Sequence, residues 1–187
     1  MTIKIVCVGS GAGNVARYLI AENIESAEVI YVNTDDEHLQ SSPVHRKILI
    51  GNGQSAGSVP AVGAKAAEDS QDELRDMLSG ADIMIIVACM GGGTGSGASP
   101  IITRIAKSLV IETVAIATMP FDFEGSQRMK QAKSAIEALK VHSDDVHVIE
   151  MERLRGDKQD KKATFSDIYL LTNDAIYRQI RTCITDR

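Results

Sequence analysis

A glycine-rich stretch in the middle of the chain constrains its fold more than any other feature. Residues 90–100 read MGGGTGSGASP, between an apolar run at 83–88 and a helical pattern that begins near Ile101. This order predicts a strand, a glycine loop and a helix, because glycine is kept where backbone takes positive φ or approaches a ligand closely. The N–H groups of such a loop and the helix start after it favour an anion, with phosphate as the expected ligand. A tight turn without a ligand is the alternative.

A second segment of the same kind lies near the N-terminus. The apolar run 3–8 opens onto GSGAGN at 9–14, and a helical pattern follows. A dinucleotide-binding GxGxxG loop needs glycine at position 14, where this chain has Asn14. Taken alone, this segment is explained about as well by a plain turn between a strand and a helix as by a phosphate-binding loop. Two such loops at the ends of two strands of one sheet would face each other, which favours a shared phosphate site.

Apolar runs and helical patterns alternate along the whole chain. Further strands are predicted at 28–32, 47–50, 82–88, 113–118 and 146–149. Helices are predicted at 61–78, after Ile101, after Gly125 and at 164–185, and the charged segment 150–162 is predicted to be an exposed connection. The near-continuous apolar character of 82–88 is typical of a parallel strand buried on both faces. The sequence thus predicts an α/β fold, three-layered and Rossmann-like, with a mostly parallel sheet of about six strands and helices on both faces.

Polar residues follow several of these strands, where ligands collect in parallel sheets. Asn33, Thr34 and Asp35 follow the second strand, and an Asx turn is the alternative explanation for them. Glu124 and Arg128 follow the fifth strand and lie four residues apart, which is the spacing of an ion pair on one helical turn.

Composition narrows the class of function. The net charge of −5 argues against nucleic acid as a partner, and no basic tract indicates a membrane surface. Cys7, Cys89 and Cys183 are odd in number and far apart, so we predict buried thiols in a reducing compartment and neither disulfides nor a zinc site. No signal peptide and no apolar run of about 18 residues is found, which indicates a cytoplasmic chain.

Four motifs resemble those of the tubulin/FtsZ family of GTPases, and the resemblance covers essentially the whole chain. GGGTGSG at 91–97 fits the family pattern GGGTG[ST]G, and NTD at 33–35 and PFDFEGSQRM at 120–129 fit two others. The GGGTGSG motif lacks the lysine of a Walker loop. Ser10 and Ala12 depart from the family's GGGGGN, and the loop at 51–60 is a few residues short of the family's γ-phosphate loop.

The resemblance implies a site for GTP or GDP. The last helix is similar to the family's central helix. In that helix an aromatic side chain stacks on guanine, an Asn lies near the base, and an Asp accepts hydrogen bonds from N1 and N2 of guanine. Adenine lacks those two donors, so GTP is expected over ATP. Asp35 is implied to lie near the phosphates and any Mg²⁺. The implied nucleotide-binding residues are Gly9, Ser10, Gly11, Ala12, Gly13, Asn14, Asn33, Asp35, Ala56, Gly57, Ser58, Gly91, Gly92, Gly93, Thr94, Gly95, Glu124, Arg128, Tyr169, Asn173 and Asp174.

The resemblance also implies a domain organisation and a role. Residues 1–163 would form the GTP-binding domain and 164–187 the start of the central helix, with the family's C-terminal activation domain absent. In the family an acidic NxDxxD loop from a neighbouring subunit positions the attacking water, and no NxDxxD occurs in these 187 residues. No catalytic residue is therefore expected within the chain.

The implied protein is a cell-division GTPase that forms filaments with itself or with full-length FtsZ subunits, in the cytoplasm and at the division site. Two alternatives stay open. One is a GTP-binding module without hydrolysis that joins or caps such filaments. The other is a Rossmann dinucleotide-binding domain, which the missing third glycine disfavours.

Overall fold

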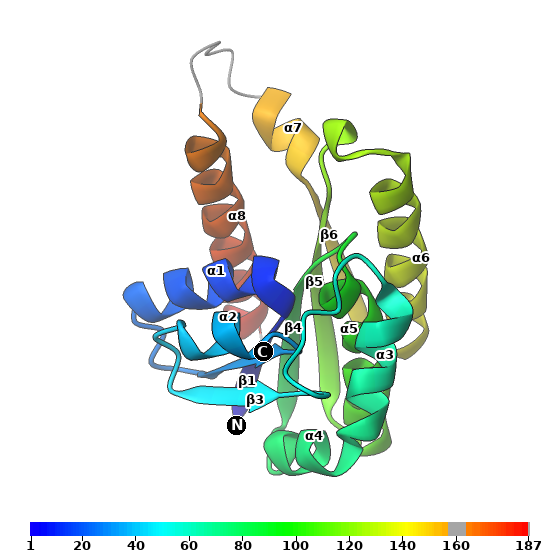
Figure 1. The fold of residues 1–187 in the computed structure, drawn as a ribbon. Coiled ribbons are helices and arrows are strands. Elements are labelled where there is room, and N and C mark those ends of the chain that lie inside the picture. The colour runs from blue at the N-terminus through cyan, green and yellow to red at the C-terminus, as the bar shows by residue number, and fades with distance from the viewer. Residues whose placement is uncertain (157–163, 187) are drawn as a thin grey trace.

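A single parallel sheet organises the structure, a computed structural model that describes residues 1–156 and 164–186. Its six strands lie in the order β3-β2-β1-β4-β5-β6, and every neighbouring pair is parallel (Figure 1). The predicted α/β class and the six-stranded sheet are confirmed. The strands are β1 (Ile3–Val8), β2 (Glu28–Asn33), β3 (Arg46–Leu49), β4 (Ile83–Cys89), β5 (Glu112–Met119) and β6 (Asp145–Glu150).

Helices cover both faces of this sheet, as predicted. One face carries α1 (Gly9–Ala21), the short α2 (Asp36–Gln40) and the long α8 (Phe165–Thr185). The other face carries α3 (Pro60–Asp69), α4 (Gln71–Leu78), α5 (Gly93–Ser108) and α6 (Ser126–His142). A 3₁₀ turn, η1 (Asp122–Glu124), precedes α6, and α7 (Met151–Gly156) follows β6. Within the described part of the chain, no helix combines the length and apolar character that a membrane crossing requires.

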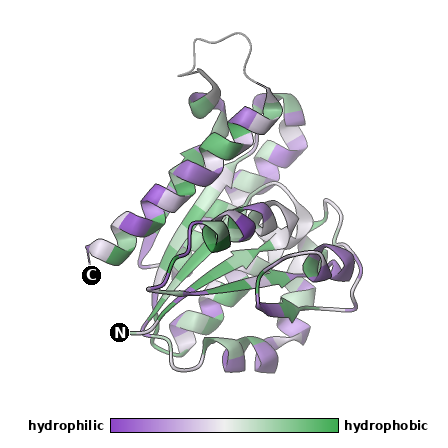
Figure 2. Cartoon of the chain, turned by 90° about the vertical axis from the view of Figure 1, so that its left-hand side faces the viewer, coloured by the Kyte–Doolittle hydropathy of each residue, from purple (hydrophilic) through white to green (hydrophobic). Residues whose placement is uncertain are grey.

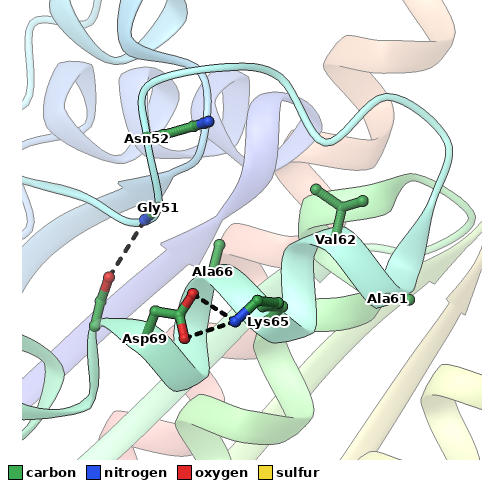
Figure 3. A pocket seen from close by; sticks show the side chains of 8 residues that line it. Gly51, Asn52, Ala61, Val62, Lys65, Ala66 and Asp69 are labelled. Carbon is green, nitrogen blue, oxygen red and sulfur yellow. Dashed lines mark hydrogen bonds and ion pairs between the residues drawn. The ribbon is translucent and has the colours of Figure 1, made fainter.

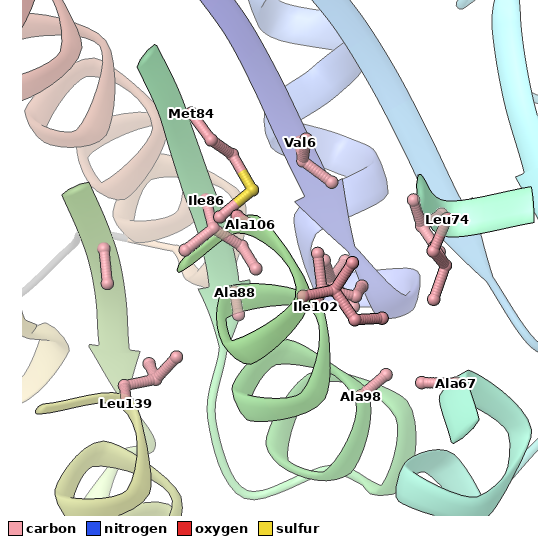
Figure 4. Packing of buried hydrophobic residues seen from close by; sticks show 14 of the residues in the cluster. Val6, Ala67, Leu74, Met84, Ile86, Ala88, Ala98, Ile102, Ala106 and Leu139 are labelled. Atoms are coloured by element: carbon pink, nitrogen blue, oxygen red, sulfur yellow. The ribbon is translucent and has the colours of Figure 1, made fainter. Parts of the chain in front are cut away.

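Two buried apolar layers hold the helices to the sheet, because successive side chains of a strand point to opposite faces. Val6, Met84 and Ile86 pack against Ile102 of α5 on one face (Figure 4). On the other face the strands pack against α1 and α8, and Ile176 of α8 is fully buried there. Accordingly, the strands are hydrophobic along most of their length, whereas the helices alternate between hydrophobic and hydrophilic residues (Figure 2).

The predicted boundaries were wrong in four places. Helix α1 begins at Gly9, within the predicted glycine loop at 9–14. Helix α5 begins at Gly93 and not near Ile101. The segment 61–78 forms two helices that meet at Ser70 rather than one. The segment 150–162 contains α7 (Met151–Gly156), and its residues 157–162 lie outside the described residues.

Close packing of α3 on α5 explains the early start of α5. An added Cβ at Gly97 would lie 1.9 Å from the carbonyl oxygen of Pro60, and one at Gly63 would lie 2.4 Å from that of Gly93. Glycine costs roughly 1 kcal/mol in a helix relative to Ala. Here the tertiary contact outweighs that cost, and the first turns of α5 are helical despite their composition.

Candidate functional site

A cavity of about 160 Å³ lies where β1 and β4 end side by side. Both glycine-rich segments contribute to its wall, as their positions after two strands of one sheet predicted. The lining residues are Val8, Gly9, Ser10, Gly11, Ser55, Gly57, Cys89, Gly92, Gly93, Thr94, Gly95 and Arg128.

Each glycine-rich segment forms the first turns of a helix rather than a loop. Helix α1 begins at Gly9 and α5 at Gly93, and neither helix start has a side-chain cap. Positive φ is used only where the chain turns into each helix, at Gly9 (+82°) and Gly91 (+99°). The uncapped N–H groups and the positive ends of two helix dipoles therefore converge on the cavity, which suits an anion.

Backbone contacts join the two helix starts to the loop after β3. An added Cβ at Gly9 would lie 2.9 Å from the backbone nitrogen of Gly95. The N–H of Gly93 donates to the carbonyl oxygen of Gly57 at 3.0 Å, and an added Cβ at Gly93 would lie 2.7 Å from that oxygen. At Gly92, by contrast, an added Cβ meets nothing within 4 Å. Gly57 has the same open space, but its φ of +56° disfavours a side chain, whereas Gly92 has a φ of −90°. Among the glycines of the wall, Gly92 therefore combines room for a side chain with an ordinary backbone conformation.

The loop after β3 reaches the cavity through one of the three predicted residues and one that was not predicted. Among Ala56, Gly57 and Ser58, only Gly57 lines the cavity, and Ser55 joins it. Ala56 is buried and its N–H donates to Thr34 Oγ1 at 3.2 Å, whereas the carbonyl oxygen of Ser58 accepts from the side chain of Gln131. The sequence carries no signal for Ser55, because the path of this loop depends on its tertiary contacts.

Asn33 supports the cavity wall from behind. Its side chain is fully buried and donates to Ser10 Oγ at 3.2 Å and to Tyr31 Oη at 2.8 Å. Burial raises the pKa of Tyr31 to about 12, so its hydroxyl stays neutral. Ser10, which departs from the family's glycine, is thus held in place by β2.

The carboxylate of Asp35 is used locally. It caps α2 by accepting from the N–H of His38 at 3.1 Å, and it pairs with His38 Nδ1 at 3.1 Å. The N–H of His38 is the main reason why the pKa of Asp35 is lowered. Asp35 does not line the cavity, and the described residues hold no group of three His, Cys, Asp or Glu side chains that could hold a metal. These side chains form no metal site by themselves, and the Mg²⁺ implied near Asp35 stays a prediction.

Glu124 and Arg128 form the predicted ion pair, with Arg128 Nε 3.1 Å from Glu124 Oε2. The other carboxylate oxygen of Glu124 accepts from the N–H of Phe121 at 2.9 Å, which fixes the carboxylate on η1. Arg128 lines the cavity and brings a cation to its edge.

Cys89 differs from the prediction of three buried thiols. Cys7 and Cys183 are buried, but Cys89 is partly exposed and lines the cavity. Desolvation raises the pKa of its thiol, so it is neutral and a weak nucleophile. An added Cβ at Gly11 would lie 2.7 Å from the Cβ of Cys89, so Cys89 fills the space beside the first helix start.

The three residues predicted on α8 lie beside the cavity rather than in it. The ring of Tyr169 meets Phe121 edge-on at 6.4 Å, and its pKa is raised by burial and then by the charge of Glu124. Asn173 follows four residues later on the same face. Asp174 lines a separate hollow of about 310 Å³ together with Tyr18 of α1.

Several other predicted residues do not line the cavity. Ala12 and Gly13 are buried within α1, where an added Cβ at Gly13 would lie 2.6 Å from Tyr31 Oη. Asn14 is exposed on α1. The N–H of Gly91 donates to Ser96 Oγ at 2.8 Å, which holds the turn into α5.

A larger hollow of about 530 Å³ lies between α3 and the loop after β3 (Figure 3). Its only charged side chains are Lys65 and Asp69, which pair with each other at 3.0 and 2.9 Å. Ala61 in the first turn of α3 and Ser70 before α4 border this hollow, but neither helix start is glycine-rich, and the one lining cation is already paired. Chemistry and not volume therefore identifies the candidate site.

Comparisons with known proteins agree with this geometry. The family model of the tubulin/FtsZ family GTPase domain matches residues 2–157. The chain is 40% identical to cell division protein FtsZ 2 of Rhizobium meliloti (strain 1021), covering 98% of this chain and 54% of that protein. It is 41% identical to cell division protein FtsZ of Buchnera aphidicola, covering 81% of this chain and 40% of that protein. The chain thus spans about half the length of the curated relatives it matches.

Solved structures share the fold. The FtsZ dimer of M. jannaschii superposes with a TM-score of 0.88 at 33% identity, covering 93% of this chain and 51% of that one. CetZ2 from Haloferax volcanii superposes at 0.83 with 24% identity, covering 96% of this chain and 57% of that one, a likeness of fold alone. With two glycine-rich helix starts at one cavity and a family match over most of its length, the chain belongs to the tubulin/FtsZ family and carries its GTPase domain.

Proposed function

We propose that the chain is the GTP-binding domain of an FtsZ-like cell-division GTPase. The phosphates of GTP or GDP occupy the cavity between α1 and α5, and the base lies toward α8. One observation carries the proposal: two uncapped helix starts and the side chain of Arg128 converge on a single cavity. Backbone N–H groups and a guanidinium are good partners for phosphate oxygens. A dinucleotide-binding domain has less support, because Asn14 replaces its third glycine.

Each part of the nucleotide has candidate partners. The N–H groups at the starts of α1 and α5 bind the phosphates, with Arg128 beside them, and Glu124 binds the ribose hydroxyls. Tyr169 stacks on the base with Asn173 near it, and Asp174 accepts from N1 and N2 of guanine. Asp174 is half-buried and its carboxylate pairs with Arg178 at 2.9 Å, which leaves acceptor capacity on its other oxygen.

The test is calorimetric binding of GDP and ADP, which avoids turnover. GDP should bind about 5- to 150-fold more tightly, because adenine leaves the Asp174 carboxylate unsatisfied at a cost of about 1–3 kcal/mol. Asp174→Ala should erase the preference, while Asp186→Ala, at the exposed end of α8, should leave it unchanged. Equal affinities for GDP and ADP in the unmodified chain would sink the assignment.

We further propose that residues 1–163 form the GTP-binding domain, that residues 164–187 begin the family's central helix, and that the protein works in cytoplasmic filaments at the division site. Among the solved structures that it resembles is an FtsZ dimer. Hydrolysis then relies on acidic residues of a neighbouring subunit, since no NxDxxD occurs in these 187 residues. A module that binds GTP without hydrolysis and joins or caps filaments is the second candidate.

A phosphate-release assay separates these candidates. The purified chain alone should release little phosphate from GTP, and release with full-length FtsZ present reports whether the two act together. Turnover proportional to this chain alone, at the rate of full-length FtsZ, would show that the water-positioning group lies within these residues. Shortening of FtsZ filaments without added turnover would favour the capping module.

A further inference from the structure

The hollow beside α8 lies where a bound nucleotide would extend from the phosphate cavity. It has a volume of about 310 Å³, within the usual range of small-molecule sites, and is lined by Tyr18, Asp167, Leu170, Leu171 and Asp174. Tyr18 comes seven residues after Gly11, which lines the phosphate cavity, so about 10 Å of α1 separates the two hollows. A nucleotide with its phosphates at Gly11 can therefore reach Tyr18 with its base if it extends along α1.

The two carboxylates in this hollow are not equivalent. Asp167 closes the capping box of α8: its carboxylate accepts from the N–H and the hydroxyl of Thr164 at 2.7 and 2.8 Å. Asp174 has only Arg178 as an ion-pair partner among the described residues, and the Arg178 side chain is 78% exposed. An exposed pair of this kind is weak, so Asp174 is the carboxylate with capacity for a ligand.

Tyr18 brings the complementary donor to the same hollow. It lies four residues after Asn14 and shares its face of α1. Its ring packs edge-on against Tyr177 of α8 at 6.1 Å, which holds the side chain between the two helices. Within the described residues the hydroxyl donates no hydrogen bond.

The protonation state of Tyr18 suits a donor. Its pKa is raised, first by desolvation and then by the negative charges of Glu22 and Asp174, with a further contribution from Tyr177 and an opposing one from Arg178. The hydroxyl therefore keeps its proton at neutral pH. Tyr18 and Asp174 line the same hollow, so one ligand can meet both the hydroxyl and the carboxylate.

We propose that Tyr18 is a base-specificity residue whose hydroxyl donates to O6 of guanine while Asp174 accepts from N1 and N2. Guanine carries an acceptor at O6, and adenine carries an amino donor at the same position. A donor beside a carboxylate therefore matches guanine along this whole edge. Adenine offers the carboxylate no donor at N1 or C2, although its 6-amino group could still donate to the hydroxyl oxygen. This inference rests on the proposed GTP site and adds Tyr18 of α1 to it.

The test compares GDP with 2-aminopurine riboside diphosphate, which lacks O6 and also the N1 proton. The informative quantity is therefore the change that Tyr18→Phe causes for each ligand, and not the difference between the two ligands. Tyr18→Phe removes only the hydroxyl, so it should weaken GDP binding by about 2- to 12-fold and leave the affinity for the analogue unchanged. Tyr177→Phe is the matched control, because it alters the other member of the ring pair and should change neither affinity. Thermal unfolding of both variants checks that the fold is intact.

The outcomes separate this inference from the GTP site itself. Unchanged GDP affinity in Tyr18→Phe, with a GDP preference that Asp174→Ala erases, overturns the role of Tyr18 and leaves the site standing. Equal loss for GDP and for the analogue also overturns it, because the effect would then not depend on O6. No preference of the unmodified chain for GDP over ADP removes both proposals.

Discussion

The two glycine-rich helix starts have similar composition but differ in what their glycines touch. In α5, added Cβ atoms would meet backbone oxygens: at 2.7 Å from Gly93, at 2.6 Å from Gly95 and at 1.9 Å from Gly97. In α1, only Gly9 would meet backbone, at 2.9 Å from the nitrogen of Gly95, and the next two glycines would meet side chains: Cys89 at 2.7 Å from Gly11 and Tyr31 at 2.6 Å from Gly13. A side chain can change rotamer or be replaced, whereas the backbone of a packed helix or strand cannot move far.

This difference explains where the chain departs from the family's glycine patterns. The α5 segment keeps GGGTGSG in full, and the α1 segment carries Ser10 and Ala12 in place of two glycines. Ser10 is exposed at the cavity wall, and Ala12 is buried against the apolar layer beneath α1. The α1 segment thus had room for two side chains, and we expect it to tolerate further change better than α5.

The largest expected effect is from Gly97→Ala. Its Cβ would overlap the carbonyl oxygen of Pro60, so α3 would have to move away from α5. We expect a loss of at least about 3 kcal/mol in the free energy of unfolding, beyond the usual range for overpacking. Urea denaturation measures it. A loss below about 1 kcal/mol would mean that α3 yields easily and that the comparison with α1 fails.

The α1 segment should show a conditional effect. Gly11→Ala should cost about 1–3 kcal/mol because its Cβ meets Cys89, and the cost should fall in a Cys89→Gly background, which removes the obstructing side chain. The double-mutant cycle should give a coupling of about 1 kcal/mol or more. Strictly additive effects would show that Gly11 is constrained by the backbone, as the glycines of α5 are.

Gly92 provides a variant that tests binding without the packing cost. Sequence reasoning alone favours Gly93→Val as a substitution that blocks phosphate in a folded protein, but the oxygens of Ala56 and Gly57 lie 2.7 Å from that Cβ. Gly92→Ala places its methyl in open space at the cavity wall. Its stability should stay within about 0.5 kcal/mol of the unmodified chain, as for ordinary surface changes.

GDP binding by Gly92→Ala should weaken about tenfold, because the methyl obstructs close approach of the phosphates, a difference of about 1.4 kcal/mol. Calorimetry measures the affinity and thermal unfolding checks the fold. Unchanged affinity would show that the start of α5 is a packing element and not a phosphate site.

Sequence patterns predicted the layers of this fold well because long apolar runs and helical periodicity report directly on burial. They failed where a tertiary contact decided the outcome. Glycine composition hid the first two turns of α5, which contact with α3 holds in helical form, and nothing marked the break at Ser70. Ser55, Cys89 and Tyr18 were missed for the same reason, since each reaches a cavity from an element whose path only the folded chain defines.

The smallest expected effect concerns the other end of α5, where glycine is missing. Val110 has a φ of +61° and is 92% exposed. The N–H of Ile111 donates to the carbonyl oxygen of Ala106, and that of Val110 donates to Lys107, which is the Schellman pattern that ends helices. This pattern requires a left-handed residue at position 110, a conformation that costs an L-residue about 1–2 kcal/mol.

Val110→Gly should therefore raise the free energy of unfolding by about 1 kcal/mol, because relief of the left-handed strain is offset in part by the greater entropy of glycine in the unfolded chain. Gly80 has a φ of +75° after α4 with nothing near its Cβ, so Gly80→Ala is the matched control and should destabilise by a similar amount. Both are exposed and distant from the cavity wall, so GDP affinity should not change. Helix α5 thus carries glycine at its start, where close contacts with neighbouring backbone exclude a Cβ. It lacks glycine at its end, where the left-handed φ is the only feature that favours glycine. A Val110→Gly variant no more stable than the unmodified chain would show that the left-handed turn at 110 is not strained and that this contrast within α5 is false.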